Sequence, residues 1–120
     1  MGFNFFRRSK YNNRIVNLDG YRFDSLKEAN RYGMLKAGAQ GGKLFDLQIH
    51  PRFLILDKFV DNQGNKHRAM HYEADFQYRV LINGKMVVHV EDVKGNKTKE
   101  YMIKKKLFLA KYRDIYFYEM

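Results

Sequence analysis

The dipeptide Asn83-Gly84 constrains the fold of this chain more than any other feature. It separates two β-prone runs, "KHRAMHYEADFQYRVLI" and "KMVVHVEDVK", and Asn-Gly is a residue pair that two-residue hairpin turns prefer. A turn of this length fixes the pairing, because the two residues that flank it face each other and each step outward pairs the next two. The sequence therefore predicts a long antiparallel hairpin in a known register.

That register predicts a cluster of charged side chains. Asp75 faces Asp92, and the next pair outward on the same face is Glu73 with Lys94, because side chains two residues apart share a face of a strand. Glu91 points to the opposite face. Opposed carboxylates repel each other and lower stability unless a cation lies between them. A three-residue loop or a β-bulge at the turn would shift the register by one residue and scatter the cluster.

A divalent cation between Asp75 and Asp92 resolves this repulsion. The chain has no Cys, and oxygen ligands suit Mg²⁺, with Mn²⁺ as its substitute, better than zinc. Lys94 would orient or deprotonate a water bound to the metal. The alternative is a solvated strand end, in which Asp92 and Lys94 have no catalytic role. The four histidines lack metal-ligand spacing, although His71 falls on the face of the proposed site.

The remaining patterns predict an α/β domain with the order α-β-β-β-α-β. Asp19-Gly20 predicts a short first hairpin, and helical spacing over 24–42 predicts a helix that ends at two glycines. A β-prone run covers 47–60, with Pro51 confined to a sheet edge or strand start. Thr98 can cap a second helix over 99–112, on which Met102, Ile103, Leu107 and Ala110 share a face. The last run, 114–120, should pair parallel to the third strand through a right-handed crossover.

Size and charge define the class of protein. The 120 residues, 45% of them apolar, are enough for a single domain over 1–120 with one core. A formal charge of +10 indicates a polyanionic partner, which nucleic acid, an anionic membrane surface or an acidic protein would satisfy. Without Cys or an apolar run of about 18 residues, we expect a soluble cytoplasmic protein with no membrane partner.

The motif Asp, hairpin, Asp-x-Lys, preceded by a helix that carries a Glu, resembles the PD-(D/E)xK nuclease superfamily. Asp75, Asp92 and Lys94 match its signature, and Ala74 stands where the superfamily's proline would be. The phrases "KYNNR", "DGYRFDSLKEANRY", "YEADFQY" and "VEDVKGNKTKEYMIKKKLF" are similar to a family of small phage-encoded endonucleases related to Holliday-junction resolvases. The resemblance covers nearly the whole chain.

This resemblance implies a restriction-endonuclease-like core, a mixed sheet flanked by two helices, and a Mg²⁺-dependent endonuclease that acts on branched DNA in phage recombination or packaging. It implies that Asp75, Asp92 and the Val93 carbonyl ligate the metal, that Lys94 assists the water, and that Glu28 completes the site. Glu28 has a second interpretation, because "SLKE" is a capping box in which Glu28 would bond back to the Ser25 amide.

Basic side chains near this site would contact the DNA backbone without reading its sequence. A homodimer follows from the need to cut two strands symmetrically. The alternatives are a nicking or restriction-type endonuclease on linear duplex, and a basic DNA-binding module without catalysis. The predicted DNA contacts are Lys97, Lys99, Lys104 and Lys105 around the second helix, and Arg7, Arg8, Lys10 and Arg14 in a basic arm over 1–14.

Overall fold

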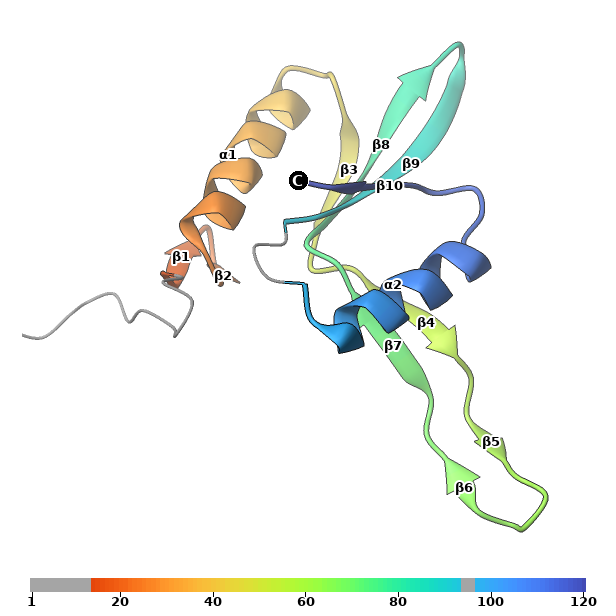
Figure 1. Ribbon diagram of the computed structural model, residues 1–120. Coiled ribbons are helices and arrows are strands. Elements are labelled where there is room, and N and C mark those ends of the chain that lie inside the picture. The colour runs from red at the N-terminus through yellow and green to blue at the C-terminus, as the bar shows by residue number, and fades with distance from the viewer. Residues whose placement is uncertain (1–13, 94–96) are drawn as a thin grey trace, which may run out of the picture.

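The computed structural model describes residues 14–93 and 97–120, which form two helices and ten strands (Figure 1). A mixed four-stranded sheet has the order β10-β9-β8-β3, and three two-stranded sheets accompany it. This confirms the predicted α/β class with a mixed sheet and two helices. In chain order, the elements are β1 (Val16–Leu18), β2 (Tyr21–Phe23), α1 (Leu26–Gln40), β3 (Phe45–Ile49), β4 (Arg52–Leu56), β5 (Phe59–Val60), β6 (Lys66–His67), β7 (Met70–Glu73), β8 (Phe76–Ile82), β9 (Lys85–Asp92), α2 (Lys99–Lys111) and β10 (Tyr116–Glu119).

The β8–β9 hairpin has the register that the Asn-Gly turn predicts. The ladder runs from Ile82 opposite Lys85 to Phe76 opposite Glu91. Asn83 and Gly84 have φ values of 50° and 79°, and positive φ at both central residues is what a type I′ turn requires. Strand β10 pairs parallel to β9, as predicted, and β3 pairs antiparallel to β8.

Both long β-prone runs break in the middle, where a continuous strand was predicted. In the first run, β3 ends at Ile49 and β4 begins at Arg52. In the second run, β7 ends at Glu73 and β8 begins at Phe76. Pro51 lies directly before β4, at a strand start as expected, because it has no N–H to donate to a ladder.

Backbone hydrogen bonds hold the two breaks side by side. The His50 N–H donates to the Asp75 carbonyl at 2.9 Å, and the Ala74 N–H donates to the Pro51 carbonyl at 3.0 Å. The Asp75 N–H donates to the Glu91 carbonyl at 3.1 Å. Beyond this junction β4 pairs with β7 and β5 with β6, so the chain continues as a two-stranded ribbon that projects from the body (Figure 1).

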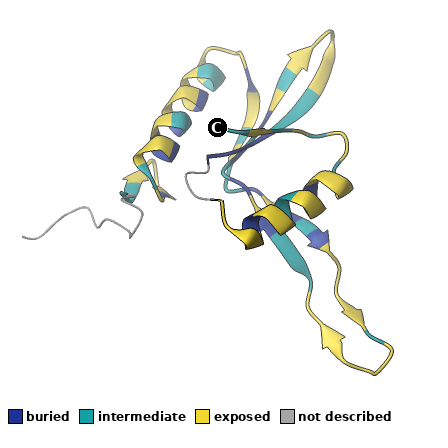
Figure 2. Cartoon of the chain, in the orientation of Figure 1, coloured by how far each residue is buried: buried dark blue, intermediate teal, exposed yellow. Residues whose placement is uncertain are grey.

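Two apolar clusters support the junction, and Figure 2 shows buried positions along the inner side of α1 and at the inner ends of β7 and β9. The first joins α1 to β8 through Ala29, Tyr32, Leu35, Phe76 and Tyr78. The second joins α2 to β4, β7 and β9 through Phe53, Ile55, Tyr72, Val90, Tyr101 and Phe108.

Both helices begin at the predicted caps. The Ser25 hydroxyl accepts from the Glu28 N–H, and the Thr98 hydroxyl accepts from the Tyr101 N–H, each at 3.1 Å. The apolar face expected of α2 is exposed instead: Met102, Ile103, Leu107 and Ala110 all lie at the surface. Tyr101 and Phe108 anchor this helix to the core. Neither α1 nor α2 is long and apolar enough to cross a membrane.

Candidate metal site

Three side chains that are distant in the sequence meet at the junction. Glu28 comes from the first turn of α1, His50 follows β3, and Asp75 precedes β8. One ligand atom of each lies within 4.8 Å of the other two, and among the described residues this group has the composition and spacing to hold a metal ion. Nε2 of His50 is 3.3 Å from Oε1 of Glu28.

Asp92 adds a second hairpin carboxylate, as the register predicted. It is the last residue of β9 and is fully buried, and the Tyr72 hydroxyl donates a hydrogen bond to its Oδ2. Oδ2 of Asp75 accepts a hydrogen bond of 2.6 Å from the Val93 N–H, across the end of the hairpin. The main chain therefore holds the Asp75 carboxylate against the end of β9.

The carboxyl groups of this cluster lie close to one another and are poorly solvated, and both effects change their pKa values. Burial, together with the negative charges of Asp92 and Glu28, raises the pKa of Asp75 to about 9. Burial also raises the pKa of Glu28, an effect that the hydrogen bond to His50 partly offsets. Without a cation, the Asp75 carboxyl group retains its proton near neutral pH, and this is the cost that the opposed Asp residues implied.

Glu91 takes no part in this cluster. Its buried carboxylate receives two 2.6 Å hydrogen bonds from the Arg31 guanidinium and one of 2.5 Å from the Tyr78 hydroxyl. These partners belong to the α1 side of the sheet, whereas Asp92 bonds to Tyr72 from the α2 side. Glu91 and Asp92 therefore point in opposite directions, as strand alternation predicts. The Arg31–Glu91 pair also attaches α1 to β9, and Arg31 lies three residues after Glu28 in the helix.

The Glu28 carboxylate lies at the site and does not bond back to the Ser25 amide as a capping box would require. Its N–H bonds to the Ser25 hydroxyl, which caps the helix. Its carboxylate is directed to His50 and Asp75 and is buried, with 6% of the residue exposed. The Glu28 N–H thus takes part in the helix cap, whereas the Glu28 carboxylate takes part in the site.

His50 is the site residue that sequence reasoning missed. The spacing of histidines along the chain was uninformative, because the four segments of this site meet only after folding. A signal did exist: His50 directly precedes the only Pro in the chain, inside a β-prone run. Its φ is +55°, an unusual value for a residue with a side chain, and such strain clusters at functional sites.

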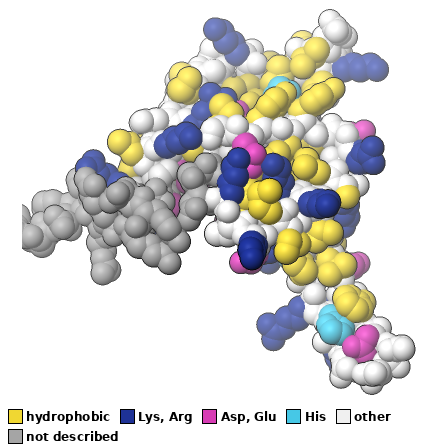
Figure 3. All heavy atoms as spheres, in the orientation of Figure 1, with side chains coloured by type: hydrophobic (Ala, Val, Ile, Leu, Met, Phe, Trp, Pro, Cys, Tyr) yellow, Lys and Arg dark blue, Asp and Glu magenta, His cyan; other side chains and the backbone are white. Residues whose placement is uncertain are grey.

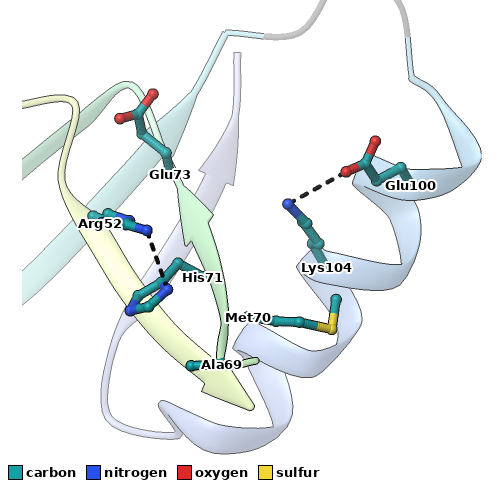
Figure 4. Close-up of a pocket in the computed structure, with 7 residues that line it drawn as sticks. All are labelled: Arg52, Ala69, Met70, His71, Glu73, Glu100 and Lys104. Carbon is teal, nitrogen blue, oxygen red and sulfur yellow. Dashed lines mark hydrogen bonds and ion pairs between the residues drawn. The ribbon is translucent and has the colours of Figure 1, made fainter. Parts of the chain in front are cut away.

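Glu73 and His71 lie outside the metal site. Glu73 has Arg52 as its ladder partner in the β4–β7 pair, and its predicted partner, Lys94, lies outside the described residues. His71 has its Nδ1 3.3 Å from Nη2 of Arg52. With Lys104 of α2, these side chains line a polar cavity of about 470 Å³ between the ribbon base and α2 (Figure 4).

The lysines predicted to contact DNA are partly engaged within the molecule. Lys97 and Lys105 lie 3.4 and 3.0 Å from Oε1 of Glu119, and Lys104 lies 3.3 Å from Glu100. Lys99 is exposed, and Arg14 is half-buried. Arg7, Arg8 and Lys10 of the predicted arm lie outside the described residues, as does Lys94. Lys and Arg side chains are nevertheless spread over the face seen in Figure 3.

The donor set is suited to a divalent cation. Carboxylates are the ligands of Mg²⁺ and Mn²⁺, and an imidazole shifts the preference from Mg²⁺ toward transition metals such as Mn²⁺. The raised pKa of Asp75 and Glu28 is the mark of carboxylates that lack a neutralising charge. The residues present therefore fit such an ion.

A family model described as "Protein of unknown function (DUF1064)" matches residues 8–118. The chain belongs to this family. The match includes every residue of the cluster, from Glu28 through Asp92. No curated protein and no solved structure matches the chain.

Proposed function

We propose that this protein is a metal-dependent DNA endonuclease of the PD-(D/E)xK type, which hydrolyses phosphodiester bonds. The observation that carries the proposal is the convergence of Glu28, His50 and Asp75 within 4.8 Å, next to the buried Asp92. The motif Asp75, hairpin, Asp92-x-Lys94 of the sequence supports it independently.

Asp75, Asp92 and the Val93 carbonyl are the proposed ligands of Mg²⁺ or Mn²⁺, with Glu28 and His50 completing the set. When bound, the metal supplies a nucleophilic water at neutral pH and stabilises negative charge on the phosphate. The Val93 N–H and the Tyr72 hydroxyl fix the two hairpin carboxylates in place. Lys94, two residues beyond Asp92, is the proposed residue that orients this water.

The charge of the chain favours a nucleic-acid substrate. A net charge of +10 attracts the phosphate backbone and releases its counterions. Branched DNA is the proposed substrate because the sequence phrases resemble those of junction-resolving endonucleases. Cutting two strands of a junction symmetrically calls for two active sites, so the working form would be a homodimer.

The test of catalysis is cleavage of labelled DNA in Mg²⁺ and, separately, in Mn²⁺, by the wild type and by Asp92→Asn. The proposal predicts metal-dependent cleavage by the wild type and a loss of at least about a hundredfold in the variant, as for removal of a group that stabilises the transition state. Arg79→Gln, on the exposed part of β8 away from the cluster, serves as the matched control. Unchanged cleavage by Asp92→Asn would remove the basis of the site assignment.

A substrate panel distinguishes the branched-DNA proposal from its alternatives. Four-way junctions, flaps, nicked duplex and linear duplex are offered at equal concentration. Preferential cutting of junctions supports a resolvase, whereas equal cutting of all four would indicate a nuclease of linear duplex. Tight binding without cleavage by the wild type in either metal would indicate a DNA-binding module without catalysis.

A further inference from the structure

The ribbon beyond the junction has a tip whose structure is built from its own side chains. β5 and β6 pair through Phe59 with His67 and Val60 with Lys66. The Phe59 and His67 rings stack with centroids 4.5 Å apart at an angle of 15°. The ribbon tip, defined as residues 57–69, is largely exposed, and it lies farther from the body than any other paired strands in Figure 1.

Asp61 organises the turn of this tip. Its Oδ1 accepts from the Gln63 and Asn65 N–H groups at 2.9 and 3.0 Å, and its Oδ2 lies 2.9 Å from Nε2 of His67. These hydrogen bonds, the one to His67 first, lower the pKa of Asp61 to about 2. Asp57 is also engaged, because its Oδ1 accepts from the Lys58 N–H. The tip therefore uses its acidic groups internally, and its shape is fixed before any partner binds.

The cations of the tip, in contrast, are unengaged. Lys58, Lys66 and Arg68 are exposed, and no ion pair or hydrogen bond of their side chains occurs within residues 14–93 and 97–120. Lys66 pairs with Val60 on the face opposite the Phe59–His67 stack, and Lys58 and Arg68 lie next to the paired strands, directly before β5 and directly after β6. Three lysines around α2 differ from these, because Lys97, Lys104 and Lys105 pair with acidic side chains.

The dimensions of the ribbon match those of duplex DNA. Its base is the junction that carries His50 and Asp75. From Pro51 to Asn62 at the turn, a rise of about 3.3 Å per residue gives a reach of about 35 Å. One turn of B-DNA measures roughly 34 Å, and the major groove admits a two-stranded ribbon.

We propose that the tip of this ribbon binds duplex DNA about one helical turn from the phosphate that the metal site acts on. Lys58, Lys66 and Arg68 contact backbone phosphates across the groove, while Phe59 and His67 keep the ribbon rigid. This inference rests on the proposed function, because it takes DNA as the substrate of the site. It adds a surface that anchors one duplex arm and sets its direction relative to the metal.

The test compares two triple variants that remove equal charge from opposite ends of the molecule. The tip variant carries Lys58→Gln, Lys66→Gln and Arg68→Gln. The control variant carries Lys43→Gln, Arg79→Gln and Lys85→Gln, on the surface near the α1–β3 and β8–β9 turns. Affinity for fluorescent four-way junctions is measured by anisotropy in EDTA, so that no cleavage occurs. One junction has arms of 25 base pairs and the other has arms of 8, too short to reach the tip. Circular dichroism and the Mn²⁺ affinity of each variant verify that fold and metal site are intact.

We expect the tip variant to bind the long-armed junction at least about tenfold more weakly than the wild type. Its slope of log affinity against log salt should fall by about 2 to 3, for up to three lost phosphate contacts. On the short-armed junction the tip variant and the wild type should bind equally. The control variant should remain within about threefold of the wild type on both.

Four results would overturn the inference: wild-type affinity of the tip variant, equal losses for both triple variants, an equal loss on long and short arms, or no binding of DNA by the wild type. Wild-type DNA affinity of the tip variant, together with a change in its sedimentation, would assign the tip to self-association. If the wild type binds DNA through the tip but never cleaves it, the proposed catalysis fails, and DNA binding by the tip is the part of the inference that stands.

Discussion

Nε2 of His50 lies 3.3 Å from Oε1 of Glu28, joining the end of β3 to the first turn of α1 across the candidate metal site. A histidine among carboxylates changes which metals bind well, because imidazole favours transition metals over Mg²⁺. His50→Ala should therefore weaken Mn²⁺ binding by at least about tenfold, and Mg²⁺ binding by less. Titration calorimetry with each metal measures both affinities.

His71→Ala is the matched control for this prediction, since His71 lies on the ribbon with Arg52 as its partner. It should bind both metals like the wild type. Equal weakening of Mn²⁺ and Mg²⁺ binding by His50→Ala would argue that His50 acts only through packing.

Protonation of Asp75 should make the effect of metal on stability dependent on pH. The folded-state pKa of about 9 lies above the ordinary value of 3.8. Folding is thus favoured while the group is protonated, and this contribution is lost as pH rises from about 4 toward 9. A bound cation removes that loss, so Mg²⁺ should raise the melting temperature more at pH 8.5 than at pH 6.

Thermal unfolding with and without Mg²⁺ at the two pH values measures the difference. Asp75→Asn should reduce both the loss of stability with pH and the effect of Mg²⁺. A metal-induced shift that is the same at both pH values would contradict the assignment of Asp75 as a ligand.

The Arg31–Glu91 pair should stabilise the attachment of α1 to β9. Arg31→Met leaves the Glu91 carboxylate buried without its cation, and removing one partner of such a pair typically costs about 3–5 kcal/mol. The double variant Arg31→Met/Glu91→Met should recover most of this loss. Urea unfolding of the two single variants and the double variant gives the coupling energy, and additive losses would show that the two groups stabilise the fold independently.

Variants of Ser25 and Glu28 should distinguish helix capping from metal binding at the N-terminus of α1. Ser25→Ala removes the hydroxyl that accepts from the Glu28 N–H and should cost about 1 kcal/mol of stability. It should leave Mn²⁺ affinity within about threefold. Glu28→Gln should keep the cap, relieve repulsion with Asp75, and weaken Mn²⁺ binding at least about tenfold. If Glu28→Gln leaves metal affinity unchanged, the Glu28 carboxylate is not a ligand of the metal.

Local signals predicted the parts of the fold that depend on a few neighbouring residues. Asn83-Gly84 set the hairpin register, and Ser25 and Thr98 marked the starts of both helices, because turn geometry and capping are short-range effects. That register was enough to predict that Asp75 and Asp92 lie near each other and that Glu91 points away.

The junction could not be predicted in the same way. The breaks at His50–Pro51 and Ala74–Asp75 stabilise each other through bonds between two distant segments. Neither run contains a glycine or a charge pattern that marks its break, and the proline of the first was compatible with a strand start. His50 enters the site only through this junction, and for that reason its role was missed. The buried face of α2 was also set by tertiary packing, through Tyr101 and Phe108.

The most direct test of the metal site is a crystal structure of the protein grown with Mn²⁺, with the ion located by its anomalous scattering. We expect one or more Mn²⁺ ions bound by Asp75 and Asp92, with Glu28 and His50 within coordination distance, at about 2.0–2.3 Å for the nearest ligand atoms. An empty cluster at saturating Mn²⁺, or an ion bound only elsewhere on the chain, would contradict it.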